Sequence, residues 1–94
     1  MEIDNQFHNK NVLITGGLGF IGSNLAIELV KLGARVTILD NMLPRQGGNL
    51  FNIRDIADKV AINISDVRNS LSMNHLVQGK DYIFHLAGQV NHVD

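Results

Sequence analysis

The sequence predicts an α/β fold in which a parallel sheet is doubly wound by helices, and the 94 residues would form its N-terminal half. Three observations lead to this fold. Apolar runs of strand length alternate with helical patterns along the chain. Glycines gather where the first apolar run passes into the first helical pattern. An aspartate, Asp40, ends the second apolar run about 20 residues beyond the last of those glycines.

The expected elements alternate as β-α-β-(α)-β-α-β. The expected strands are residues 11–15, 35–39, 59–64 and 82–86, and the expected helices are residues 20–32 and about 70–78. Residues 49–56 are expected to form a short helix or an irregular turn. Gly33, in a left-handed conformation, and Gly79 are expected to end the two helices. This alternation predicts a parallel sheet with right-handed crossovers. The expected strand order is 3-2-1-4, the first part of a Rossmann-type doubly wound sheet.

The spacing of apolar residues also predicts which side chains face the core. In the first helix, helical spacing selects Ile21, Leu25, Leu29 and Leu32 as core-facing residues. In the short helix or turn that begins at residue 49, it selects Leu50, Ile53 and Ala57. In the last helix it selects Met73, Leu76 and Val77. In the third strand, Val60, Ile62 and Ile64 alternate and are expected to share one face. Residues 1–10 are expected to be a polar lead-in, with Phe7 packed on the first strand.

The composition suits one small soluble unit, with 45% hydrophobic residues, 18% charged residues and a net charge of −1. This charge gives no reason to expect nucleic acid or an anionic membrane as partner. The absence of cysteine excludes disulfides and cysteine-based metal sites. No apolar run approaches the ~20 residues that span a bilayer, and the polar start lacks the apolar core of a secretory signal. We therefore expect a cytoplasmic location.

The glycines between the first strand and the first helix fit two related patterns. Gly17, Gly19 and Gly22 match G-x-G-x-x-G, and Gly16, Gly19 and Gly22 fit G-x-x-G-x-x-G. Early glycines allow a tight turn, Gly19 lets the backbone approach a pyrophosphate, and Gly22 lets the helix pack close to the strand. The helix start then offers free N–H groups and the positive end of its dipole to phosphates. The alternative is a glycine-rich turn with no ligand.

Residues 15–22, Thr-Gly-Gly-Leu-Gly-Phe-Ile-Gly, resemble the cofactor turn of the extended short-chain dehydrogenase/reductase family. The resemblance is to its NAD-dependent nucleotide-sugar epimerase/dehydratase branch, and similar segments extend over about 11–94. It implies that residues 11–94 are the N-terminal part of an NAD(P)-binding Rossmann domain, truncated before the catalytic region. It also implies that the cofactor is bound at Gly16, Gly19, Phe20, Ile21 and Gly22.

Asp40 has the spacing of the acid that meets the adenosine ribose. A carboxylate there accepts hydrogen bonds from the ribose hydroxyls and repels a 2′-phosphate, so NAD is favoured over NADP. Asp40-Asn41 also resembles the Asp-Asn pair of NAD-using sugar epimerases. Arg45 points the other way, because an arginine in this loop can accommodate a 2′-phosphate. An ordinary loop aspartate is the alternative interpretation.

Two later segments resemble further cofactor contacts of the same branch. Asp66-Val67 is similar to the pair that contacts adenine, although an aspartate near a helix start also suits the helix dipole. Leu86-Ala87-Gly88 is similar to the family's His-Leu-Ala-Ala segment, with Gly88 in place of the second alanine. These small residues would let the backbone approach the ribose and nicotinamide side of the cofactor. Residues 48–50 and 91–94 also resemble family segments. For residues 48–50, a packing turn without ligand contact is the alternative interpretation.

No catalytic or metal-binding residue is expected in the chain. The family's catalytic Tyr-x-x-x-Lys pair is missing, because the only tyrosine is Tyr82 and the residue four positions later is Leu86. His85 and His92 lack the carboxylate or cysteine partners of a zinc site, and His85 on a buried strand is expected to be a structural histidine. His8 and His75 are expected to lie on the surface.

The resemblance implies an NAD-binding N-terminal fragment of an enzyme that transfers a hydride between a nucleotide-sugar carbon and NAD. Two alternatives remain open: an NAD(P)-binding or regulatory module of the same fold without chemistry, and a structural fragment without ligand affinity. The apolar fourth strand, residues 82–86, would lie at an open sheet edge. Self-association through that edge is therefore expected.

Overall fold

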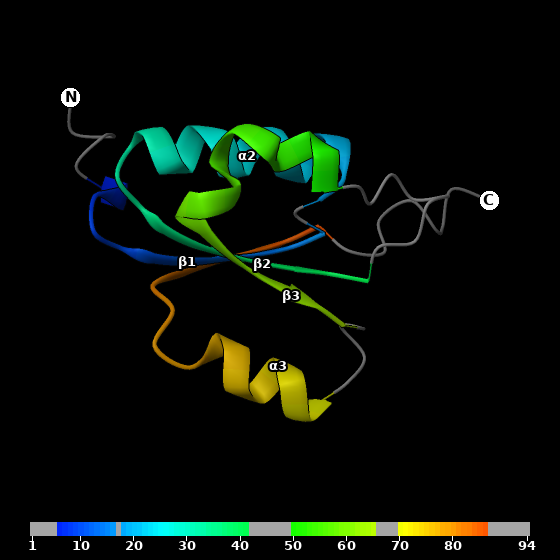
Figure 1. Ribbon diagram of the computed structural model, residues 1–94. Helices are drawn as coiled ribbons and strands as arrows, with labels where there is room; N and C mark the ends of the chain where they lie inside the picture. The colour runs from blue at the N-terminus through cyan, green and yellow to red at the C-terminus, as the bar shows by residue number, and fades with distance from the viewer. Residues whose placement is uncertain (1–5, 17, 42–49, 66–69, 87–94) are drawn as a thin grey trace.

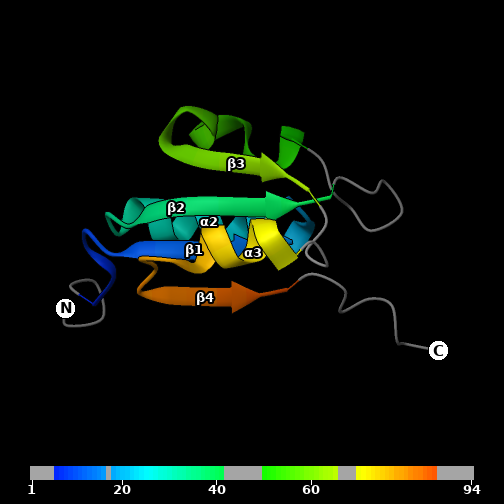
Figure 2. The ribbon, with the colours of Figure 1, turned by 90° about the horizontal axis from the view of Figure 1, so that it is seen from below.

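The computed structural model describes residues 6–16, 18–41, 50–65 and 70–86. Its centre is a four-stranded sheet of β1 (Asn11–Thr15), β2 (Arg35–Asp40), β3 (Val60–Ile64) and β4 (Tyr82–His85). The strand order is β3-β2-β1-β4 and each neighbouring pair is parallel, so the predicted order is confirmed. Figure 2 shows the strands side by side, all pointing toward the same edge of the sheet.

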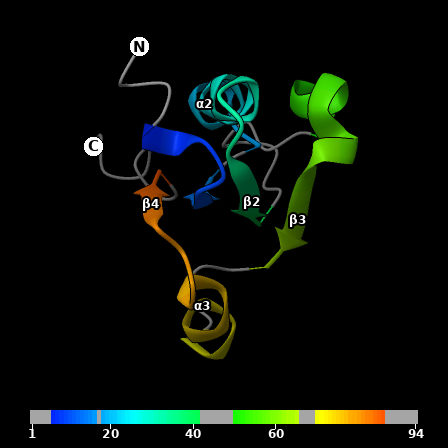
Figure 3. The ribbon, with the colours of Figure 1, turned by 90° about the vertical axis from the view of Figure 1, so that its left-hand side faces the viewer.

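Helices lie on both faces of the sheet. The α-helix α2 (Phe20–Lys31) and the 3-10 helix η2 (Leu50–Lys59) cover one face, and α3 (Ser70–Val77) lies on the other (Figures 1 and 3). As predicted, Gly33 and Gly79 follow the two α-helices with φ of 88° and 75°, a left-handed conformation that glycine adopts without steric cost. The layered arrangement is that of a doubly wound α/β fold.

The buried core lies between the sheet and the α2–η2 layer. Alternate residues of β1 and β2 point into it, because successive side chains of a strand face opposite sides of the sheet. Its buried members are Val12, Ile14, Leu18, Ala26, Leu29, Ala34, Val36, Ile38, Ile53 and Ile56. Phe7 packs against this core from the lead-in, with its ring centroid 4.9 Å from that of Tyr82 in β4.

The predicted inner face of α2 is partly wrong. Leu29 is buried as expected, but Ile21 is 69% exposed. The buried residues are Gly22, Ser23, Ala26 and Leu29. Small side chains at three of these positions let the helix backbone come close to the strands, which turns the larger Ile21 toward solvent. A pattern based on large apolar residues therefore misplaces the contact face.

The predicted face of the segment after β2 is also corrected. Ile53 is buried as expected, but it is joined by Ile56, while Leu50 and Ala57 are exposed. Ile53 and Ile56 are three residues apart, the spacing that shares a face in a 3-10 helix, whereas Leu50 lies on the other side of the kink at Ile53. Four-residue α-helical spacing to Ala57 does not apply here.

The face of the sheet beneath α3 is less completely covered than the face beneath α2 and η2. Leu13 and Leu39 are fully buried on it, yet no side chain of α3 that the structure describes is itself buried. Met73, Leu76 and Val77 are half-buried, as an inner stripe, whereas Leu71 is 81% exposed. At the edge of the sheet Ile64 is also half-exposed, so the predicted core role of β3 holds for Val60 and Ile62 only.

Candidate functional site

The glycine turn sits at the carboxyl end of β1 and leads directly into α2. Gly16 has a φ of 77°, which a side chain would make unfavourable. Its N–H donates to the carbonyl of Leu39 in β2 at 2.7 Å, and the N–H of Gly19 donates back to the Gly16 carbonyl at 3.2 Å. The turn is thus closed on itself and tied to the end of the neighbouring strand.

The start of α2 has the features of an anion site. Gly19 is the N-cap and supplies no side-chain hydrogen bond, and the first turn of the helix contains no acidic residue. The first N–H groups of an α-helix have no partner within the helix, and the positive end of the dipole lies there. The exposed side chains of Phe20 and Ile21 and the buried Gly22 belong to this first turn.

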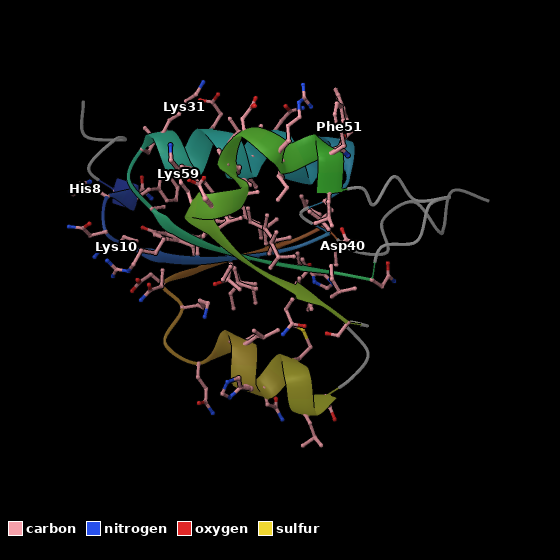
Figure 4. The ribbon with its side chains drawn as sticks, in the orientation of Figure 1. His8, Lys10, Lys31, Asp40, Phe51 and Lys59 are labelled. Atoms are coloured by element: carbon pink, nitrogen blue, oxygen red, sulfur yellow. The ribbon has the colours of Figure 1, made fainter. Side chains whose placement is uncertain are left out.

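Asp40 ends β2 beside the turn. Its side chain is only 6% exposed, and its Oδ2 accepts a hydrogen bond from the N–H of Leu18 at 3.0 Å. Leu18 itself is fully buried. Figure 4 shows Asp40 at the edge of the sheet where β1 passes into α2. The carboxylate therefore braces the backbone of the turn, a role that the ribose interpretation alone does not include.

A second side chain holds the same residue from the other side. Asn52 of η2 donates from Nδ2 to the carbonyl of Leu18 at 2.7 Å. The sequence gives no sign of this role for Asn52, since Asn52 lies 34 residues from Leu18 and belongs to no local motif. Only the docking of η2 against α2 and the sheet brings the amide to the turn.

The opposite flank of the turn is tied to β4. The Thr15 hydroxyl, buried at the end of β1, is hydrogen-bonded to His85 Nδ1 at 2.8 Å. The N–H of Leu86 donates to the Thr15 carbonyl at 2.9 Å and to its hydroxyl at 3.1 Å. His85 is exposed rather than buried, because β4 is the last strand of the described sheet and has no neighbour on its outer side, but the predicted structural role agrees with this hydrogen bond. His8 and His75 are exposed, as predicted.

The structure brings most of the predicted cofactor residues to one edge of the sheet. Those described there are Gly16, Gly19, Phe20, Ile21, Gly22, Asp40, Asn41 and Leu86. Asp66, Val67, Ala87 and Gly88 lie outside the described residues, as do Gly17 and Arg45. Thr15 and Asn52 join the site without having been predicted as site residues.

No group of three or more His, Cys, Asp or Glu side chains in 6–16, 18–41, 50–65 and 70–86 is placed to hold a metal ion. Within the same ranges, no helix has both the length and the apolar character needed to cross a membrane.

Comparison with known proteins gives consistent results. Residues 13–94 match the family model of GDP-mannose 4,6 dehydratase. The UDP-N-acetyl-alpha-D-glucosaminuronate decarboxylase of Bacillus cytotoxicus is 44% identical over 78 residues, which is 83% of this chain and 23% of the relative. The bifunctional UDP-glucose 4-epimerase and UDP-xylose 4-epimerase 3 of Arabidopsis thaliana is 33% identical over 86 residues, covering 84% of this chain and 24% of the relative.

Solved structures agree. Epimerase Mth375 of Methanothermobacter thermautotrophicus superposes with a TM-score of 0.80 at 34% identity, covering 93% of this chain and 25% of that protein. The Bordetella bronchiseptica enzyme WbmF, solved in complex with NAD+, gives a TM-score of 0.74 at 33% identity, covering 86% and 24%. The chain thus spans about a quarter of the length of these relatives. With the parallel sheet and the glycine turn, these matches show that the chain belongs to the extended short-chain dehydrogenase/reductase family, in its nucleotide-sugar epimerase/dehydratase branch.

Proposed function

We propose that this chain binds NAD at the turn between β1 and α2, as the cofactor-binding N-terminal part of a nucleotide-sugar epimerase or dehydratase. The observation that carries the proposal is the buried Asp40 carboxylate, which holds the turn backbone beside the start of α2. Family members support it, because WbmF and the dTDP-glucose 4,6-dehydratase of Bacillus anthracis were both solved in complex with NAD.

In this proposal the pyrophosphate lies over Gly16 and Gly19. It accepts hydrogen bonds from the N–H groups of Phe20, Ile21 and Gly22 in the first turn of α2. An N-cap without a side chain leaves room for the phosphates, and a first turn without acids does not repel them. The tie from Gly16 to Leu39 supports a turn that is formed before the ligand arrives.

Asp40, with Asn41 beside it, takes the adenosine ribose. A carboxylate has about four acceptor sites, so the bond from the Leu18 N–H is compatible with further bonds from ribose hydroxyls. The negative charge opposes a 2′-phosphate, which favours NAD over NADP. Arg45 is the residue that could offset this preference.

The remaining contacts follow the same edge of the sheet. Asp66 and Val67 meet the adenine, and Leu86, Ala87 and Gly88 meet the ribose and nicotinamide side. The contact proposed for Leu86 is supported by the position of this residue, since its N–H is hydrogen-bonded to Thr15, next to the turn.

The reaction of the whole protein is hydride transfer between a sugar carbon and NAD, with a nucleotide sugar as substrate. WbmF has also been solved with UDP, and the two curated relatives are named for UDP-linked sugars. These 94 residues supply the cofactor site for that chemistry, while a Tyr-x-x-x-Lys pair is absent from them.

Calorimetric titration of the chain with NAD and NADP tests the proposal. Gly19→Val should abolish NAD binding, since a branched side chain blocks the approach of the pyrophosphate. It should leave the fold intact, because Gly19 has φ −75° and ψ 177°, an extended conformation open to any residue. Ala61→Val, on the exposed part of β3, is the control and should bind as the unchanged chain does.

NAD should bind at least about fivefold more tightly than NADP, because Coulomb repulsion from Asp40 costs on the order of 1 kcal/mol or more. NAD affinity that survives Gly19→Val would contradict the site. Equal or tighter NADP binding would contradict the assigned role of Asp40 in cofactor choice.

A further inference from the structure

We infer that Asn52 is a positioning residue for the phosphate-binding turn: its side-chain amide sets the orientation of the peptide group between Leu18 and Gly19. The inference rests on the proposed NAD site and adds to it a residue from outside the glycine motif. The carrying contact is the hydrogen bond from Asn52 Nδ2 to the Leu18 carbonyl, which at 2.7 Å is short for an N–H donor.

The peptide unit explains why one carbonyl matters. Peptide groups are planar and trans, so the Leu18 carbonyl and the Gly19 N–H point in opposite directions from the same plane. With the carbonyl held by Asn52, the Gly19 N–H is directed toward the Gly16 carbonyl, where it makes its 3.2 Å bond. Rotation of this one plane would open the turn and displace Gly19, the N-cap of α2.

Leu18 is held on both sides by different elements. Asp40 at the end of β2 accepts its N–H, and Asn52 of η2 donates to its carbonyl. The two peptide planes that flank its α-carbon are therefore each fixed by a side chain from elsewhere in the fold. The fully buried Leu18 side chain adds a third restraint. The turn is thus preorganised by side chains outside the glycine motif.

Asn52 is itself well placed to act as an anchor. Its neighbour Ile53 is fully buried in the core, which fixes the backbone of η2 at this point. On its other side the exposed Phe51 stacks under the Arg54 guanidinium, 3.9 Å from the ring centroid. Figure 4 shows Phe51 and Asp40 at the same end of the molecule, close to the start of α2. The amide donor therefore approaches the turn from an element that is anchored in the core by its neighbour Ile53.

The test compares three variants of the chain: Asn52→Ala, Asn52→Asp and Asn11→Ala. Asn52→Asp keeps the shape of the side chain but replaces the donor by an acceptor that faces a carbonyl. Asn11 is the matched control, because its Nδ2 also donates to the backbone carbonyl of a distant turn, that of Gly79 at 3.2 Å, but at the end of β1 opposite the glycine turn. Circular dichroism verifies the fold of each variant, and two substitutions at position 52 keep the test valid should one fail to fold.

Two readouts are measured. NAD affinity should fall about three- to tenfold in Asn52→Ala, because one hydrogen bond is lost, and further in Asn52→Asp, while Asn11→Ala stays within twofold. Without any ligand, hydrogen exchange of the Gly19 amide should be faster in the Asn52 variants than in the unchanged chain, because its bond to Gly16 is loosened.

A residue that only stabilises the fold would lower the melting temperature without changing NAD affinity at temperatures where the chain is folded. That result, or unchanged exchange of the Gly19 amide, would overturn the inference. Failure of the unchanged chain to bind NAD would instead overturn the proposed function, and the exchange measurement would still decide the role of Asn52.

Discussion

The two faces of the sheet differ in how they are held. On the α2–η2 face, ten buried residues from the strands, both helices and the connecting turns form one cluster. On the other face, Leu13 and Leu39 are buried, but α3 contributes only half-buried or exposed side chains among those described. The proposed NAD turn belongs to the first face through Leu18 and α2. The comparison teaches that the position of the turn depends on the packed face, whereas the α3 face tolerates change.

The largest expected effect is on stability, and it compares one isoleucine from each face. Ile38→Ala should lower the free energy of unfolding by about 2–5 kcal/mol, because Ile38 is fully buried and the truncation leaves a cavity. Ile83→Ala in β4 should cost less than about 1 kcal/mol, since Ile83 is already 47% exposed on the α3 face. Urea unfolding of both variants measures the difference. Equal losses would mean that the two faces are equally well packed.

The second comparison uses two carboxylates that each accept one backbone N–H. Asp40 accepts from Leu18 in a buried setting at 3.0 Å, and Asp81 accepts from Asn11 in an exposed one at 2.8 Å. Asp40→Ala should cost about 1.5–3 kcal/mol, because a buried N–H loses a charged acceptor, whereas water replaces Asp81 at less than about 1 kcal/mol. Thermal unfolding of the two variants tests this. A larger loss for Asp81→Ala would contradict the bracing role of Asp40.

A smaller effect is expected where β1 meets β4. Thr15→Val keeps the shape of the side chain but removes the hydroxyl that joins His85 and Leu86. The expected cost is about 1 kcal/mol. Thr37→Val is the control, because Thr37 is half-buried on the same face of β2 and its hydroxyl makes no hydrogen bond within the described part of the chain. Matching melting temperatures for the two variants would show that the Thr15 hydroxyl does not join the strands.

The smallest predicted effect concerns the outer side of β4, the last strand of the sheet. β4 lies at the end of the strand order, with the half-exposed Ile83 near its middle. We predict weak, concentration-dependent self-association of the chain through this strand, which Ile83→Lys should reduce. Sedimentation velocity over a range of concentrations measures it. A strictly monomeric unchanged chain would contradict the prediction.

The architecture could be predicted because each of its elements follows from the pattern of residues close together in the sequence. The strand 11–15, the left-handed Gly33 and the glycine turn each depend on neighbouring residues, and the structure places them as expected. The order of the strands followed from the doubly wound fold that the alternation of strands and helices predicts.

The bracing of the site could not be predicted in the same way. Asp40 and Asn52 reach Leu18 across 22 and 34 residues, and Thr15 reaches His85 across 70. Such contacts depend on how elements dock, which no local pattern contains. The exposed Ile21 is a second case that local spacing does not predict. The helix packs closely on the sheet through the small residues Gly22 and Ala26, and this leaves the large apolar side chain of Ile21 in solvent.

The most direct measurement is to follow the backbone amide resonances of the chain during titration with NAD. We predict that the largest shifts occur at Gly19, Phe20, Ile21 and Gly22, with smaller ones at Leu86, because these N–H groups lie at the edge where the pyrophosphate and ribose would bind. Amides of α3 should remain unchanged. Shifts that concentrate on α3, or no shifts at millimolar NAD, would contradict the assignment of the turn as the cofactor site.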